Sequence, residues 1–174
     1  ILVTPGYVAR DNCRILRASI HQGDGVLFKG PYCGFESCSM AMTIIMRAAI
    51  LPISQWTRDI VTHSLIAGHR LYSMVMYKTC VKLHPEMIRA CFNLPGRYLQ
   101  VREFDIVTKC VLLFENLFTL HFEDESQLFG TLSDGYNPKS PEEGPGKTLL
   151  DALWELFDKH SAGIFIAGNK PIAV

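Results

Sequence analysis

The sequence predicts an α/β fold of the α+β kind, because helical and strand-like patterns both occur and occupy separate stretches of the chain. The segment "SCSMAMTIIMRAAI", residues 37–50, is rich in Ala, Met and Ile, and no helix breaker follows until Pro52. It predicts a buried helix. The pattern over 148–160 predicts an amphipathic helix with Thr148 as its N-cap. Two apolar runs separated by Gly168 and Asn169 predict a hairpin over 162–174.

Weaker patterns predict the rest of the secondary structure. Apolar residues recur at helical spacing over 57–74, and the alternating, aromatic-rich segments have the composition of strands. The predicted elements are an extended segment over 15–24 that runs into a glycine turn, helices over 57–74 and 85–92, and strands over 98–104 and 117–123.

The segment 133–147 is predicted to be an exposed loop. It contains three prolines and three glycines, which favour turns over regular structure. The whole chain has 174 residues and is 48% hydrophobic, enough for one substantial core and too short for two ordinary domains. We therefore expect a single domain over 1–174, and the absence of an initiator Met suggests a piece of a longer chain.

Charge and hydropathy disfavour several classes of partner. Seventeen basic and seventeen acidic side chains give a formal net charge of +0, so no general field attracts nucleic acid or an acidic membrane. The longest apolar runs fall well short of the roughly 20 residues of a membrane-spanning helix, and the start of the chain lacks a secretory signal pattern. We expect a protein that binds neither nucleic acid nor membrane and needs no cofactor.

The cysteines are scattered singly through apolar surroundings, which is not the pattern of a disulfide framework. Four residues separate Cys33 from Cys38, the closest pair, and this spacing is not that of a structural zinc site. The cysteines are therefore expected to be unpaired and metal-free, in a reducing, intracellular setting.

Cys38 is the candidate nucleophile. If Ser37 caps the predicted helix, Cys38 lies in its first turn, where unpaired backbone N–H groups and the helix dipole lower the pKa of a thiol. Gln22 lies upstream across a glycine-rich segment, which is expected to fold its carboxamide back beside the helix as an oxyanion donor. The alternative is structural: Cys38 is a small core residue and Gln22 an ordinary turn residue.

The segment "HQGD", followed by a glycine-containing stretch and then by "CSMAMT", resembles the start of the ubiquitin-specific cysteine protease of herpesvirus large tegument proteins. The resemblance continues through Trp56, "IAGHRLY", Leu94 with Pro95, Gly130 to Leu132, and "TLLDALWELF" before "AGIFIAGNKPIAV". One position departs from the family pattern: Ser37 stands where the family usually has a glutamine directly before the nucleophile.

The resemblance implies a papain-like arrangement, with the helix that bears the nucleophile packed on a mainly antiparallel sheet. It further implies a deubiquitinase that acts through a thioester at Cys38, with Gln22 serving the oxyanion hole. The expected partner is ubiquitin or a ubiquitin-like protein, and the expected location is the cytoplasm or nucleus of a host cell.

The position of the general base is a separate question. The family carries it as Asp-x-His on a strand, and the one literal match here is Asp158 with His160. That pair falls at the end of a predicted helix, where side chains two residues apart diverge by roughly 200°. The order of the segments instead places the base beyond Val174. The remaining histidines, His63, His69, His84 and His121 (the last near Asp124), are expected to be surface or core residues.

Two alternatives to a deubiquitinase remain. The first is a catalytically inactive ubiquitin-binding or interaction module of the same fold. The second is a cysteine peptidase or acyltransferase that acts on something other than ubiquitin.

Overall fold

The computed structural model describes residues 7–10, 13–28, 32–83, 96–120, 130–131, 147–167 and 170–174. It combines helices with small two-stranded sheets, so the coarse α+β prediction is confirmed. The chain divides into two compact units. The first comprises Ile1–His121 and Ile164–Ala173, and the second comprises Phe122–Gly163 with Val174. The single domain over 1–174 stays a prediction.

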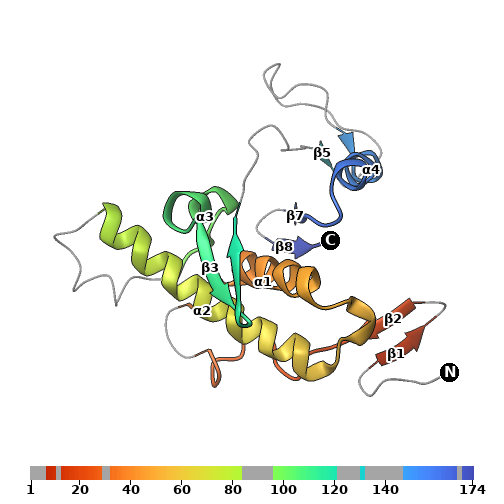
Figure 1. Ribbon diagram of the computed structural model, residues 1–174, viewed down its shortest axis with the longest axis horizontal. Coiled ribbons are helices and arrows are strands. Elements are labelled where there is room, and N and C mark those ends of the chain that lie inside the picture. Colours follow the sequence, from red (N-terminus) through yellow and green to blue (C-terminus); the bar gives the residue numbers. More distant parts are fainter. Residues whose placement is uncertain are drawn as a thin grey trace. The chain divides into compact units, whose positions relative to one another are not determined.

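Two long helices, α1 (Ser37–Ile50) and α2 (Arg58–Leu83), lie side by side in the first unit (Figure 1). Their backbones approach closely at Gly68, where an added Cβ would lie 2.7 Å from the Cα of Met40. A little further along, the Thr43 hydroxyl donates a hydrogen bond of 2.9 Å to the Ser64 carbonyl oxygen. A close approach of helix backbones therefore explains the glycine within α2.

The helix predicted over 37–50 is confirmed, and the one predicted over 57–74 is longer than expected because it continues to Leu83. Its extension is held by burial, since Val75 and Met76 are 0% and 4% exposed. A short 3₁₀ helix, η1 (Ile53–Gln55), connects α1 with α2.

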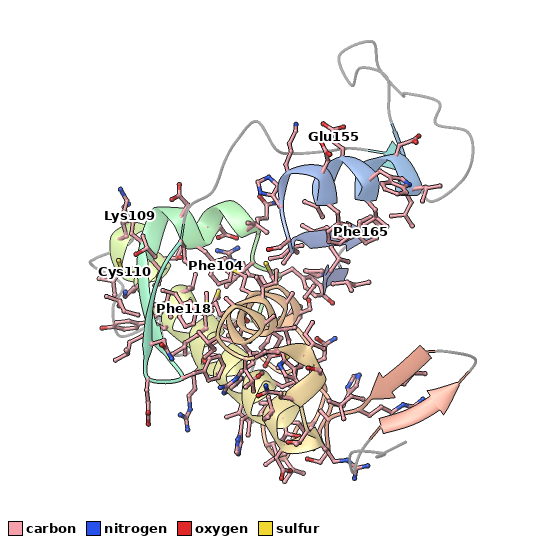
Figure 2. The ribbon with its side chains drawn as sticks, turned by 45° about the vertical axis from the view of Figure 1, so that its right-hand side comes forward. Phe104, Lys109, Cys110, Phe118, Glu155 and Phe165 are labelled. Carbon is pink, nitrogen blue, oxygen red and sulfur yellow. The ribbon has the colours of Figure 1, made fainter. Side chains whose placement is uncertain are left out.

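The strand predicted over 98–104 is wrong, because Val101–Val107 forms a helix, α3. A capping box starts this helix: the Gln100 side chain accepts from the backbone of Glu103, whose carboxylate accepts from the Gln100 N–H at 2.8 Å. Phe104 is fully buried, and in Figure 2 it lies between α3 and the α1–α2 pair. Capping and burial of Phe104 thus outweigh the alternating pattern.

Three hairpins are antiparallel: β1 (Tyr7–Arg10) with β2 (Cys13–Leu16), β3 (Cys110–Leu113) with β4 (Asn116–Thr119), and β7 (Ile164–Ala167) with β8 (Lys170–Ala173). β8 packs against α1. The β3–β4 turn uses Phe114 and Glu115 at φ 52° and 62°, a conformation that non-glycine residues adopt rarely.

The predicted hairpin over 162–174 is confirmed, and the strand predicted over 117–123 is confirmed for residues 117–119. The extended segment over 15–24 is strand only at its start, in β2. The helix predicted over 85–92 lies outside the described residues, as does the loop predicted over 133–147 except for Lys147.

In the second unit, α4 (Leu149–Lys159) confirms the predicted amphipathic helix. It packs on a short parallel pair, β5 (Gly130–Thr131) and β6 (Lys147–Thr148). Thr148, the predicted N-cap, is the last residue of β6 and stands directly before the helix. Across both units, the described residues contain no helix with the length and apolar character needed to cross a bilayer.

Candidate active site around Cys38

The segment from Gln22 to Gly34 folds back toward the start of α1. The carbonyl oxygen of Gln22 accepts a hydrogen bond of 3.2 Å from the Gly34 N–H and one of 3.9 Å from the Cys33 thiol. Gly34 has a φ of +88°, which a glycine adopts without strain. The main chain of Gln22 is thus held beside the residues that lead directly into α1, whereas the role expected for its carboxamide stays a prediction.

A buried carboxylate joins this loop to both long helices. Glu36, at the N-cap position of α1, is 0% exposed, and its Oε2 accepts a hydrogen bond of 2.8 Å from the Gly34 N–H. Its Oε1 lies 3.1 Å from Nδ1 of His69 on α2. The His69 ring also contacts the Phe28 ring, with centroids 5.0 Å apart. Glu36 and His69 therefore fix the start of α1 against α2.

The start of α1 differs from the sequence prediction at Ser37. We expected Ser37 to be the N-cap, but Glu36 takes that position and Ser37 is the first helical residue. The Glu36 carboxylate forms no capping hydrogen bond, and the buried Ser37 hydroxyl has no partner in the described part of the chain. Within the described residues, the first turn of α1 therefore receives no capping hydrogen bond from the side chain of its N-cap residue.

Cys38 lies in this first turn, as predicted, but its thiol is not ionised. The residue is 1% exposed, and burial together with the negative charge of Glu103 raises the pKa of Cys38 to about 12. The expectation that the helix N-terminus lowers this pKa is therefore wrong for this conformation: loss of hydration disfavours the thiolate more than the dipole favours it.

Gln22 and Cys38 stand at the same end of α1, but no hydrogen bond joins them. The Gln22 side chain is half-buried, and its carboxamide makes no hydrogen bond to any other described residue. The Cys38 sulfur likewise has no hydrogen-bond partner in the described ranges. The structure thus holds the main chain of Gln22 near the helix. Within the described residues, neither the Gln22 carboxamide nor the Cys38 thiol is engaged in a hydrogen bond.

The candidate histidines lie in different surroundings. His69 is oriented by Glu36, whereas His63 is exposed on α2. Asp158 is exposed within α4 and His160 follows the end of that helix, its N–H donating to the Leu156 carbonyl oxygen, as expected for a helix terminus. His84, His121 and Asp124 lie outside the described residues.

The Glu36–His69 pair was not predicted from the sequence. The two residues are 33 positions apart, and Glu36 follows glycines and aromatics that read as an irregular loop. The available signal was the position of an acidic residue directly before a small-residue helix, which is where an N-cap is expected.

A disulfide at Cys80 departs from the expectation of unpaired cysteines. Cys33, Cys38 and Cys110 are free, but Cys80 is disulfide-bonded. Disulfides are more typical of oxidising compartments, so Cys80 does not fit the expected reducing setting. Figure 2 shows Cys110 at the outer side of the β3–β4 hairpin, in agreement with its exposure.

Comparison of the chain with models of known protein families finds no match, and comparison with curated proteins finds no significant one.

Proposed function

We propose that this chain is a cysteine peptidase domain that hydrolyses the isopeptide bond after the C-terminal glycine of ubiquitin or a ubiquitin-like protein. The observation that carries the proposal is the position of Cys38 in an uncapped first turn, beside the anchored loop of Gln22. Backbone N–H groups of a first helical turn and a side-chain carboxamide are the kinds of donor that a tetrahedral oxyanion needs.

The reaction would proceed in two steps. The Cys38 sulfur attacks the glycine carbonyl carbon while a general base takes the thiol proton; the base then passes this proton to the lysine nitrogen, the carbon–nitrogen bond breaks, the amine leaves and a thioester remains on Cys38. Water then hydrolyses the thioester, releasing the glycine carboxylate and restoring the thiol.

The fold supports a papain-like arrangement as part of this proposal. α1, which carries Cys38, packs against β8 of the antiparallel β7–β8 hairpin. The tegument-protein resemblance implies that an Asp-x-His base on a strand completes such a site. The backbone approach expected around Gln22 and Cys38 suits a Gly-Gly tail, because only glycine fits between two closely spaced backbones.

The burial of Cys38 sets a condition on this mechanism. With a pKa of about 12 the thiol is neutral near pH 7. Because Cys38 is only 1% exposed, a substrate carbonyl carbon cannot reach its sulfur in this conformation. The proposal therefore requires that the arriving C-terminal tail displaces the groups that cover the sulfur.

The same observation favours a second candidate, a ubiquitin-binding module without catalytic activity. A buried, neutral cysteine among Met and Ala side chains is what a structural residue looks like. In that case ubiquitin binds, but no bond is cleaved.

Cleavage of a fluorogenic amide at the ubiquitin C-terminus, measured on the full-length protein, tests the proposal. We expect turnover by the wild type, loss of turnover with Cys38→Ala, and a decrease of about 10²-fold in kcat with Gln22→Ala. Cys110→Ala is the matched control, because Cys110 is also a free cysteine and is exposed on β3. Its activity should equal that of the wild type.

Two results would contradict the proposal in different ways. Saturable ubiquitin binding without turnover would identify the inactive module. Absence of both binding and turnover would leave a cysteine enzyme with an unrelated substrate, or no enzyme.

A further inference from the structure

A cavity of about 580 Å³ lies in the first unit, between the C-terminal part of α1, one face of α2 and the turn of the β3–β4 hairpin. Its lining is apolar with a basic component. The apolar residues are Ile66, Ala67, Leu112, Leu113 and Phe114, and the basic ones are Arg47, His63 and Arg70. No acidic residue belongs to the described lining.

Arg47 forms one wall of the cavity. The carbon at the centre of its guanidinium lies 3.4 Å from the centroid of the Phe114 ring, a cation–π contact that fixes the plane of the group. Its Nε is buried and has no hydrogen-bond partner among the described residues. A position in the last turn of α1 lets the positive charge stabilise the helix dipole, but it leaves this N–H unsatisfied.

Arg70 supplies a second guanidinium at the rim. It is exposed, and it shares one face of α2 with His63 and Ala67, because these residues are separated by intervals of three and four. Neither Arg47 nor Arg70 forms an ion pair with a carboxylate in the described part of the chain. Two arginines without an ion-pair partner among the described residues thus line the same cavity as the apolar side chains.

We propose that this cavity binds a small organic carboxylate with an apolar body. The carboxylate would pair with the guanidinium groups of Arg47 and Arg70, because each guanidinium presents the fork of donors that a carboxylate matches. The apolar body would cover Ile66, Leu112 and Leu113. Inorganic anions would leave these apolar walls in contact with water.

This cavity is distinct from the candidate active site. Arg47 lies in the last turn of α1 and Cys38 in its first, so about 13 Å of helix separates them. Ligand binding here does not depend on whether the chain is a peptidase, and the two ideas fail independently.

Titration of the purified protein with octanoate and with its neutral isostere octanamide, followed by calorimetry, tests the proposal. We expect octanoate to bind at least about tenfold more tightly than octanamide, because only the carboxylate pairs with the guanidinium groups. Arg70→Gln should weaken octanoate binding about fivefold or more and leave octanamide unchanged. Arg47→Lys should also weaken octanoate, since lysine keeps the charge but lacks the Nε donor.

Lys78→Gln is the matched control, because Lys78 is exposed on the same helix and lies outside the cavity lining. It removes one positive charge and should leave octanoate affinity unchanged. Arg70 is exposed, so its substitution does not put folding at risk, and circular dichroism of each variant verifies this. Equal affinities for octanoate and octanamide, no binding of octanoate, or an equal loss with Lys78→Gln and Arg70→Gln would overturn the proposal.

Discussion

Glu36 and Cys38 are close in sequence but belong to different environments. Glu36 faces Gly34 and His69, whereas the acidic charge that acts on Cys38 comes from Glu103 of α3. Side chains two positions apart at a helix start point in different directions, so His69 is oriented by Glu36 without forming a dyad with Cys38. The Glu36–His69 pair therefore fixes the start of α1, and the proposed peptidase mechanism would need its general base from another residue.

The raised pKa of Cys38 predicts a specific dependence of stability on pH. In the unfolded chain the thiol ionises near its ordinary value of 9.0, whereas in the folded chain it stays neutral up to about 12. Because the unfolded state then binds fewer protons, the free energy of unfolding should fall as pH rises from about 9 to 12. Below pH 9 this contribution is fully present.

Denaturant unfolding at a series of pH values, for wild type and Cys38→Ala, measures this contribution as a difference between two slopes. The decline should be shallower for Cys38→Ala, and Cys110→Ala should follow the wild type because Cys110 is exposed. Parallel curves for the wild type and Cys38→Ala would show that Cys38 ionises as freely in the folded protein as in the unfolded chain.

Packing at the level of elements depends on Gly68. An added Cβ there would lie 2.7 Å from both Cα and Cγ of Met40 and 3.0 Å from its backbone N, so α1 and α2 would have to separate. Gly68→Ala should lower the free energy of unfolding by about 1–3 kcal/mol, although alanine is the better helix former.

Gly25→Ala is the control for this prediction, because an added Cβ at Gly25 meets nothing within 4 Å. Its stability, measured by urea denaturation, should stay within about 0.5 kcal/mol of the wild type. A Gly68→Ala variant as stable as the wild type would show that the two helices do not pack as described.

Elements with one dominant signal could be predicted from the sequence, and elements decided by competing signals could not. The α1 helix follows from an uninterrupted Ala, Met and Ile segment, and the β7–β8 hairpin from two apolar runs around a turn dipeptide. The α3 segment alternates like a strand, yet the Gln100–Glu103 capping box makes it a helix. At Phe114 and Glu115 the turn uses positive φ values in residues that give no sign of it.

The candidate site was predictable in position but not in its electrostatics. Sequence reasoning located Cys38 in a first helical turn and folded Gln22 back toward it, because both expectations depend on local chain geometry. The burial of Cys38 and the Glu36–His69 contact depend on α2 and α3, which are distant in sequence. Local patterns do not predict contacts between such distant segments, although the position of Glu36 directly before the helix was a local signal.

The first unit has a two-helix core, and the two ends of α1 carry different features. Its first turn holds the candidate nucleophile, and its last turn holds Arg47 of the basic, apolar cavity. In the described conformation the nucleophile is closed off, so activity would depend on a substrate that opens the site. If substrate binding opens the site, the chain is an enzyme; if it does not, Cys38 is a structural core residue.

Parallel labelling with two thiol reagents tests whether ubiquitin opens the site around Cys38. The full-length protein is treated at pH 8 with a ubiquitin whose C-terminus carries an alkyne electrophile, or with iodoacetamide, and the modified cysteines are identified by mass spectrometry. We expect the ubiquitin electrophile to form an adduct on Cys38. Iodoacetamide should modify the exposed Cys110 and leave Cys38 unmodified. If ubiquitin binds but neither reagent modifies Cys38, the proposal that the substrate opens the site is wrong.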